Sequence, residues 1–305
     1  MASPKLLFIL GSIVIYLFSL TIAQNEPLSN ICLNDKGNFT ANSTYQANLN
    51  YLLSSLTSNN EIDYGFYNAS YGRETDKVNA MALCRGDVKP DTCRSCIQNS
   101  SLQLTKSCPT QKEAVVWYDD CMLRYSNRSL FGNMEYTPYA WMYNVNNVSE
   151  VSQFREVLGK LLNNLTKKAA SGGPLRKFAT GNSTTPGSPP IYALMQCTPD
   201  LSEQECVECL NDVTSLIPKC CDGRQGGRVI TPSCNFRYEK DIFYDSTVYV
   251  ATPSPSPSPA SPSAASSPPN SATQRGRESS LSQTVVHIAV PLLILQYLSS
   301  TSALF

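Results

Sequence analysis

Residues 84–96 read CRGDVKPDTCRSC, and residues 197–209 read CTPDLSEQECVEC. Both stretches have the spacing Cys-x8-Cys-x2-Cys, and the second lies 113 positions after the first. The same shift aligns CMLRY at 121–125 with CNFRY at 234–238. Matches that persist over this distance without a gap indicate an internal repeat. We therefore expect one structural unit to occur twice in the chain.

Helical and strand-like patterns surround each cysteine motif. Apolar residues recur at helical spacing in 49–56 and again in 154–165. A second helix is expected through each Cys-x-x-Cys pair, where Ser202 and Glu205 have the spacing of a capping box. Strand-like runs close the repeats at 114–118, 121–125, 228–231 and 234–238. These patterns predict an α+β fold with two tandem domains, at 24–135 and 136–248.

Both ends of the chain have the composition of targeting segments. Residues 1–23 combine a basic residue, an apolar stretch and small residues, as in a secretory signal peptide. Residues 249–272 are a Pro/Ser/Ala-rich linker that cannot bury a core. Residues 273–305 form a polar spacer and an apolar tail, which predicts a GPI-attachment signal with Asn270, or else Ser271, as the attachment site. The alternatives are a single transmembrane span and a free secreted protein.

Composition disfavours several functional classes. Lys+Arg and Asp+Glu both number 24 among 305 residues, and this zero net charge argues against nucleic-acid binding. The single histidine, His287, lies in the C-terminal segment, so histidine-dependent nucleophiles and zinc sites are not expected. Asp119 and Asp120 are neighbours, and neighbours on a strand point to opposite faces, which makes them a poor catalytic dyad. We expect no enzyme activity, no metal and no cofactor.

The chain has 12 cysteines, and their chemistry depends on the compartment. A Cys-x-x-Cys pair can serve as a redox centre, but neither repeat shows the βαβ pattern that such a centre accompanies. A four-thiolate zinc site would have to join pairs from both repeats in an oxidising compartment. Secretion favours structural disulfides instead, and spacing alone leaves their connectivity open.

Sequons for N-glycosylation agree with secretion. They occur at Asn38, Asn42, Asn68, Asn99, Asn127, Asn147, Asn164 and Asn182. We expect a heavily glycosylated surface.

The doubled cysteine motif, closed in each repeat by Cys-x-x-Arg-Tyr, resembles the plant cysteine-rich repeat secretory proteins. Their unit is the stress-antifungal (ginkbilobin-homologous) domain, which also occurs in the ectodomains of cysteine-rich receptor-like kinases. The resemblance covers about 30–248, and no kinase motif is present. It implies that each domain has two helices packed on a five-stranded antiparallel sheet. It also implies the disulfides Cys32–Cys108, Cys84–Cys93, Cys96–Cys121, Cys197–Cys206 and Cys209–Cys234.

The second domain departs from the family pattern. The cysteine that should pair with Cys221 is missing, and by its spacing to the first helix its place is taken by Tyr143. Cys220 is an additional cysteine. A vicinal Cys220–Cys221 bond and an intermolecular bond would both account for this pair, and the sequence leaves the choice open.

The resemblance also implies a carbohydrate site. An antifungal seed protein of the family binds mannose through an Asn, an Arg and a Glu, and these positions correspond to Asn144, Arg228 and Glu239 here. Arg supplies donors, Glu supplies acceptors and Asn supplies both, which suits a sugar hydroxyl. Asn146 and Asn147 are alternatives to Asn144, and a cross-strand ion pair between Arg228 and Glu239 is an interpretation without a ligand. The first domain has lost the site, with these residues at the matching positions: Leu33, Val115 and Ser126.

Aromatic residues gather near the domain junction: Tyr136, Tyr139, Trp141 and Tyr143. We favour packing in a core or an interdomain seam over stacking on sugars or contact with a partner.

Two functions follow from the resemblance. The first is a non-catalytic, membrane-tethered extracellular protein that binds a mannose-type glycan through its second domain in defence or stress response. The alternative is a co-receptor or adhesion module that binds cell-surface receptor proteins, in particular receptor kinases. In both cases we expect the protein at the extracellular face of the plasma membrane, or else secreted to the apoplast.

Overall fold

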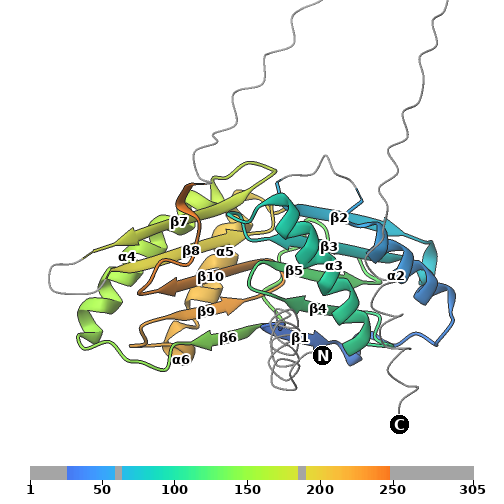
Figure 1. Cartoon of the computed structure of the whole chain (residues 1–305), viewed down its shortest axis with the longest axis horizontal. Helices are drawn as coiled ribbons and strands as arrows, with labels where there is room; N and C mark the ends of the chain where they lie inside the picture. The colour runs from blue at the N-terminus through green and yellow to red at the C-terminus, as the bar shows by residue number, and fades with distance from the viewer. Residues whose placement is uncertain (1–25, 59–63, 185–189, 248–305) are drawn as a thin grey trace, which may run out of the picture. The chain divides into compact units, whose positions relative to one another are not determined.

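A computed structural model of the protein describes residues 26–58, 64–184 and 190–247. The predicted signal peptide, linker and GPI-attachment signal, with Asn270 and Ser271, lie outside these residues. The described part contains two five-stranded antiparallel sheets with the same strand order (Figure 1).

The first sheet has the order β1-β4-β5-β3-β2. The elements of this domain are β1 (Ser29–Cys32), the short 3-10 helix η1 (Asn34–Lys36), α2 (Thr44–Ser55), β2 (Phe66–Tyr71), the 3-10 helix η2 (Glu74–Asp76), β3 (Val78–Cys84), α3 (Pro90–Ser107), β4 (Ala114–Trp117) and β5 (Cys121–Ser126). The apolar pattern at 49–56 thus falls mainly on α2, and the first Cys-x-x-Cys pair lies on α3.

The second sheet repeats this order as β6-β9-β10-β8-β7. Its domain consists of β6 (Ala140–Tyr143), α4 (Val151–Ala170), β7 (Lys177–Ser183), β8 (Ile191–Cys197), α5 (Glu203–Thr214), the one-turn helix α6 (Ile217–Cys220), β9 (Gly227–Ile230) and β10 (Cys234–Glu239). The predicted α+β class with two tandem domains is confirmed.

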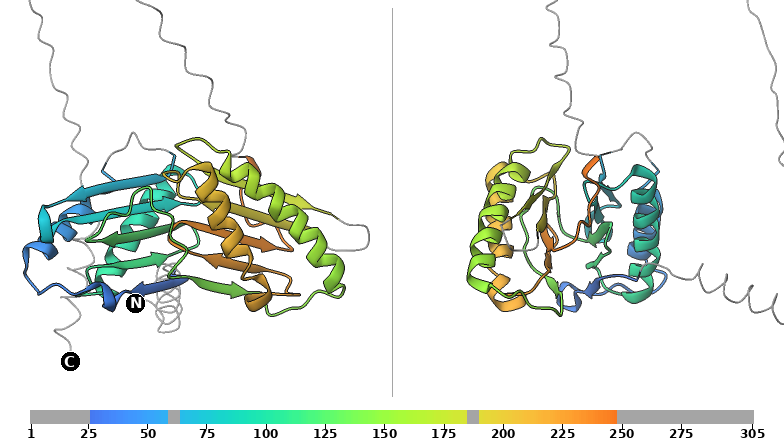
Figure 2. Two further views of the ribbon diagram at one scale, coloured as in Figure 1. Left: turned by 180° about the vertical axis from the view of Figure 1, so that it is seen from behind. Right: turned by 60° about the vertical axis from the view of Figure 1, so that its left-hand side comes forward.

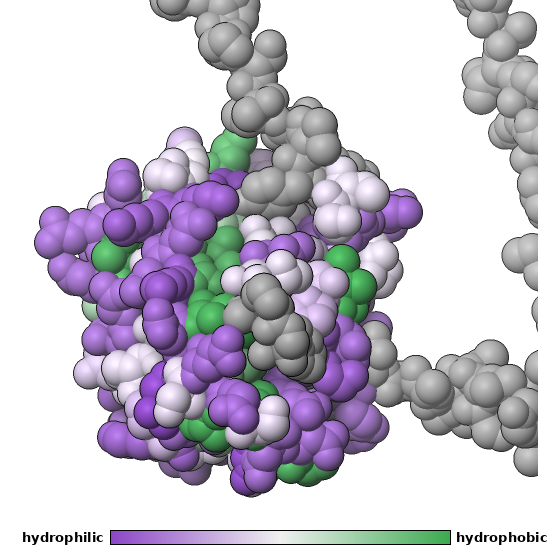
Figure 3. Space-filling model, turned by 90° about the vertical axis from the view of Figure 1, so that its left-hand side faces the viewer, coloured by the Kyte–Doolittle hydropathy of each residue, from purple (hydrophilic) through white to green (hydrophobic). Residues whose placement is uncertain are grey.

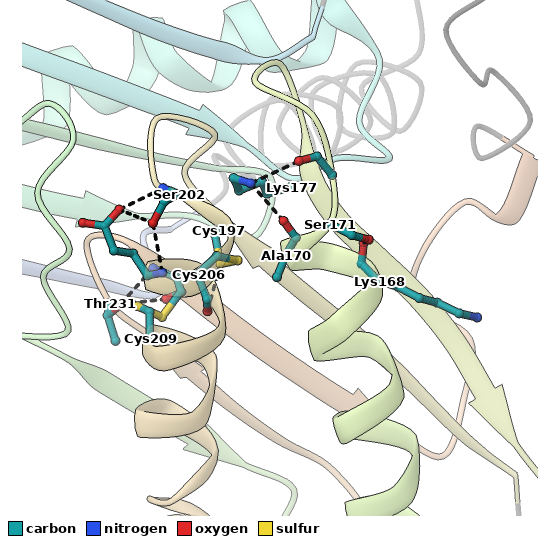
Figure 4. Close-up of a disulfide and its surroundings, with 12 residues drawn as sticks. Lys168, Ala170, Ser171, Lys177, Cys197, Ser202, Cys206, Cys209 and Thr231 are labelled. Atoms are coloured by element: carbon teal, nitrogen blue, oxygen red, sulfur yellow. Dashed lines mark hydrogen bonds between the residues drawn. A yellow bond between two sulfur atoms is a disulfide. The ribbon is translucent and has the colours of Figure 1, made fainter.

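Each sheet carries its helices on one face (Figure 2). Leu49 and Leu52 of α2 and Leu158 and Leu162 of α4 are buried against their sheets, because residues three and four positions apart share one face of a helix. The predicted capping box at Ser202 is present at the start of α5, beside the Cys197–Cys206 disulfide (Figure 4). It satisfies backbone N–H groups that the first helical turn leaves without partners.

The disulfides tie helices to strands. The structure contains the pairs Cys32–Cys108, Cys84–Cys93, Cys96–Cys121, Cys197–Cys206, Cys209–Cys234 and Cys220–Cys221. The first five are the pairs that the family resemblance implies. Cys220 and Cys221 are joined to each other, which is the vicinal one of the two alternatives that the sequence leaves open.

The two domains share a buried apolar seam. A cluster of buried side chains contains Val115 and Trp117 from the first sheet together with Ile230 from the second. The Trp117 indole N–H donates to the carbonyl of Thr231 at 3.2 Å. Because a buried indole N–H needs an acceptor, this bond fixes the position of the ring across the seam.

The segment after β10 returns to the first domain. The backbone N–H of Asp245 donates to the buried carboxylate of Asp87 at 2.8 Å, and the same carboxylate binds Arg85. Gly86, between Arg85 and Asp87, lies against the ring of Phe178 on β7 of the second domain. A Cβ atom at this position would overlap the ring.

The surface viewed from the end of the second domain is mainly hydrophilic, with separate hydrophobic patches (Figure 3). All the sequon asparagines are exposed. Within the described ranges, no helix is long and apolar enough to cross a membrane.

Candidate functional site

The strand register places Asn144 at the position carried over from the family. Cys32 on β1 lies opposite Ala114, and Tyr143 on β6 lies opposite Gly227, so Tyr143 occupies the place of the missing cysteine. The next residue in each domain makes the matching backbone hydrogen bond: Leu33 to Glu113 in the first domain, and Asn144 to Gly226 in the second. Asn144 is therefore the structural counterpart of Leu33.

The three carried-over residues line one cavity of about 260 Å³. Asn144 follows β6, Arg228 lies on β9 and Glu239 ends β10. Besides these, the cavity is lined by Arg237 of β10, by Asp119 of the first domain and by Leu28, Met142, Tyr143 and Gly227. The site is thus formed by both domains.

Arg228 is almost buried in this site, and its guanidinium binds Asp119 of the first domain. Its residue exposure is only 9%, and both of its terminal nitrogens bind Asp119. Nη1 donates to Asp119 Oδ1 at 2.5 Å, and Nη2 donates to the Asp119 carbonyl at 3.3 Å. Its Nε is buried without a partner among the described residues. Burial lowers the pKa of Arg228, against the opposing charge of Asp119.

Asp119 gathers three arginines around one carboxylate. In addition to Arg228, its Oδ1 accepts from Arg237 Nη1 at 3.0 Å and its Oδ2 accepts from Arg85 Nη1 at 2.8 Å. Burial alone would raise the pKa of Asp119, but the charges of Arg228, Arg237 and Arg85 hold this pKa below its ordinary value. The three guanidinium groups thus favour the ionised form of the Asp119 carboxylate.

Glu239 pairs with Arg237 and not with Arg228. Arg237 Nε donates to Glu239 Oε1 at 3.1 Å, because the two side chains are two positions apart on β10 and share a face. The predicted ion pair between Arg228 and Glu239 is therefore wrong, since Asp119 captures Arg228 from the other domain. Asn144 Oδ1 accepts from the N–H of Asn146 at 2.9 Å, which fixes the amide in a turn.

The first domain fills the equivalent place with its own side chains. Arg124, the counterpart of Arg237, donates to Glu113 and to Glu135, both at 2.6 Å. Arg128 donates to the same two carboxylates. Burial opposes ionisation of Glu113, yet the hydrogen bonds from Arg128 and Arg124 hold the pKa of Glu113 below its ordinary value. Arg124, unlike Arg237, is thus enclosed by acids of its own domain and is only 2% exposed.

The acid beside the equivalent arginines, Arg124 and Arg237, comes from a different position in each domain. In the first domain the acid is Glu113, before β4, and Ser126 ends β5. In the second domain Gly226 stands in place of the first acid, and Glu239 stands in place of the serine. A Cβ on Gly226 would overlap Glu239 Oε2, so the glycine is required for the glutamate to lie there.

The aromatic residues near the junction are exposed. Tyr136, Tyr139, Trp141 and Tyr143 have exposures between 38% and 49%, so the expectation that they fill a core or an interdomain seam is wrong. Trp141 and Tyr143 lie on β6, an edge strand with a neighbour on one side only, and Tyr136 and Tyr139 lie in the segment before it. The rings of Tyr139 and Trp141 stack at 5.5 Å, and Arg224 lies 4.9 Å from the ring of Tyr143.

Asp119 and Asp120 lie in the turn between β4 and β5, and not on a strand as expected. Arg85 binds Asp119 and lies 3.6 Å from Asp120. Burial raises the pKa of Asp120, whereas the pKa of Asp119 is lowered. Residues that could hold a metal ion do not cluster anywhere in the described ranges.

Residues 31–128 and 142–241 match the family model described as salt stress response/antifungal. The chain belongs to this family.

Relatives within the salt stress response/antifungal family fall into two groups. The chain is 42% identical over 216 residues to cysteine-rich repeat secretory protein 38 of Arabidopsis thaliana, and the match covers 71% of this chain and 85% of that protein. It is 39% identical over 221 residues to the antimicrobial ginkbilobin-2-like protein of Castanea crenata, covering 72% of this chain and 90% of the relative. These matches make it a cysteine-rich protein of the extracellular type, related to defence and stress proteins.

Receptor-like kinases form the second group. Cysteine-rich receptor-like protein kinase 29 of Arabidopsis thaliana is 48% identical over 214 residues, which are 69% of this chain and 32% of the kinase. The chain thus spans about a third of the length of the kinases that it matches. The crystal structure of the tandem DUF26 ectodomain of the Arabidopsis thaliana protein PDLP8 has the same fold, with a TM-score of 0.62, 22% identity and coverage of 71% and 98%.

Sequence reasoning did not assign two charged residues, Arg237 and Asp119, to the cavity. Arg237 belongs to the repeated Cys-x-x-Arg-Tyr motif, so a signal for it was present. Asp119 carried no such signal, because its role depends on how the two domains pack.

Proposed function

We propose that this protein is a non-catalytic extracellular lectin of defence or stress response, which binds a mannose-type sugar in the cavity of its second domain. The observation that carries the proposal is that Asn144, Arg228 and Glu239 line one cavity although they come from three different segments. Donor and acceptor groups converge there, and a sugar hydroxyl needs both. A relative named as antimicrobial and the family description of salt stress response/antifungal support the defence role.

Titration calorimetry of mannose and short mannans into the secreted, disulfide-bonded chain tests this proposal. Glu239→Gln removes the acceptor charge in the cavity, whereas Glu156→Gln makes the same change on the exposed surface of α4, where Glu156 pairs only with Lys160 among the described residues. Saturable heat that Glu239→Gln abolishes and Glu156→Gln preserves is the expected result. Absence of heat from the folded wild type would refute the lectin function.

A second candidate function is a co-receptor or adhesion module for receptor kinases. The stacked, exposed rings of Tyr139, just before edge strand β6, and of Trp141, on that strand, favour it, since aromatic side chains are enriched in protein interfaces. Biolayer interferometry with purified ectodomains of cysteine-rich receptor-like kinases checks this function. Binding that Trp141→Ala weakens at least tenfold would support it, and no binding by the wild type would remove it.

The membrane tether and the glycans are further parts of the proposal. A GPI anchor at Asn270 or Ser271 predicts that phosphatidylinositol-specific phospholipase C releases the protein from the cell surface. Exposure of every sequon asparagine agrees with glycosylation, and a mass decrease after deglycosylation would measure it.

A further inference from the structure

Each arginine of the cavity uses two of its three guanidinium nitrogens, but they differ in which nitrogen has no partner and in how exposed the side chain is, at 11% for Arg228 and 23% for Arg237. Arg228 and Arg237 lie directly opposite each other on β9 and β10, so both side chains are on the sheet face that meets the first domain. Both terminal nitrogens of Arg228 bind Asp119, and the residue is only 9% exposed. The nitrogen that remains without a partner among the described residues, Nε, is buried, so Arg228 presents little free donor surface to a sugar.

Arg237 keeps one end of its guanidinium unused. Nε binds Glu239 and Nη1 binds Asp119, whereas Nη2 has no partner among the described residues. The central carbon of the guanidinium lies over the ring of Phe243, 4.3 Å from the ring centroid, as in a cation–π contact. Two hydrogen bonds and the cation–π contact therefore hold the group in one orientation, so little conformational entropy is lost when a ligand binds it.

Two other groups beside Arg237 also have spare hydrogen-bonding capacity. Glu239 Oε2 accepts no hydrogen bond from the described residues, since only Oε1 is used by Arg237. The amide nitrogen of Asn144 donates to no described residue, since only its oxygen is used in the turn. One acceptor and two donors thus remain for a ligand in the cavity.

We propose that Arg237 is the guanidinium that contacts the sugar, together with Glu239 and Asn144, and that Arg228 instead joins the two domains through Asp119. The proposal rests on the lectin function above and assigns its contact residues. Donors beside an acceptor suit two adjacent hydroxyls of a sugar ring. Two arginines and two acids line the cavity, so their charges cancel, and the expected ligand is a neutral hexose.

The test compares Lys substitutions at both arginines by titration calorimetry with mannose and by thermal unfolding. Arg237→Lys keeps the charge but loses the planar guanidinium with its fixed N–H donors. We expect the affinity for mannose to fall about tenfold or more. Arg228→Lys is expected to lower the melting temperature and to cost at least threefold less affinity than Arg237→Lys. Arg155→Lys, on the exposed surface of α4, is the matched control and keeps the wild-type affinity.

A second variant guards against misfolding of the Arg237 variant. Phe243→Leu removes the stacked ring without touching the charge, and it is expected to weaken binding about threefold. Wild-type affinity in both Arg237→Lys and Phe243→Leu, or a larger loss in Arg228→Lys than in Arg237→Lys, would overturn the assignment while leaving the lectin function intact. No binding by the folded wild type would overturn both.

Discussion

The missing disulfide of the second domain can be restored by two substitutions, Tyr143→Cys and Cys220→Ser. Tyr143 occupies the position of Cys32, and Cys221 occupies that of Cys108. Cys221 Sγ lies 2.8 Å from where a Cβ on Gly227 would be, and Gly227 is the residue paired with Tyr143. Replacing Cys220 releases Cys221 from its vicinal partner. We expect a disulfide to form between positions 143 and 221 of this variant.

The size of the effect follows from the first domain. Cys32–Cys108 spans 76 residues, and the new bond would close a loop of nearly the same length. The loss of chain entropy in the unfolded state corresponds to a gain of about 4 kcal/mol for a loop of this size. For a folded unit of about 200 residues, this gain raises the melting temperature by about 8 to 16 °C.

Peptide mapping of the unreduced protein identifies the bond, and thermal and urea denaturation measure its contribution. The control is Tyr143→Ser with Cys220→Ser, which differs only in the absence of the bridge. The reasoning is refuted if positions 143 and 221 remain unlinked under oxidising conditions, or if the linked form is no more stable than the control.

Three further predictions concern the first domain and the seam. Glu113→Gln leaves the buried guanidinium of Arg124 with Glu135 as its remaining partner, and should lower the free energy of unfolding by about 3 kcal/mol in urea denaturation; an unchanged midpoint would contradict this. Because the pKa values of Glu113 and Glu135 are lowered on folding, their stabilisation is complete above about pH 4.3 and is lost as the pH falls through the folded-state values. A flat stability profile from about pH 5 to about pH 2 would refute this. Gly86→Ala places a methyl group against the ring of Phe178 and should cost about 1 to 3 kcal/mol, measured by thermal unfolding; a melting temperature at or above that of the wild type would show that the seam adapts.

Features within one repeat were accessible from the sequence. The shift between the cysteine motifs and the helical spacing of leucines in α2 and α4 predicted the correct class and domain order, because local periodicity and repetition reflect the packing inside each unit. The placement of Tyr143 at a cysteine position agrees with the strand register, in which Tyr143 pairs with Gly227 as Cys32 pairs with Ala114.

Contacts between the two repeats could not be predicted from the sequence. The partner of Arg228 is Asp119, which is 109 positions away and lies in a turn of the other domain. No pattern within one repeat contains this contact. The exposure of Trp141 likewise depends on β6 being at the edge of its sheet, and the strand order that puts it there is set by pairing between distant segments.

The hydrogen bond from Asp245 to Asp87 determines how force enters the molecule. The segment that follows β10 is tied to the first domain and is not free to peel away from the second domain alone. Tension applied beyond residue 247 would therefore load the Asp87 carboxylate and its bonds to Arg85 before it reached the second sheet. Because the hydroxyl of the preceding residue, Tyr244, donates to the carbonyl of Gly181 on β7, both domains would share the pull.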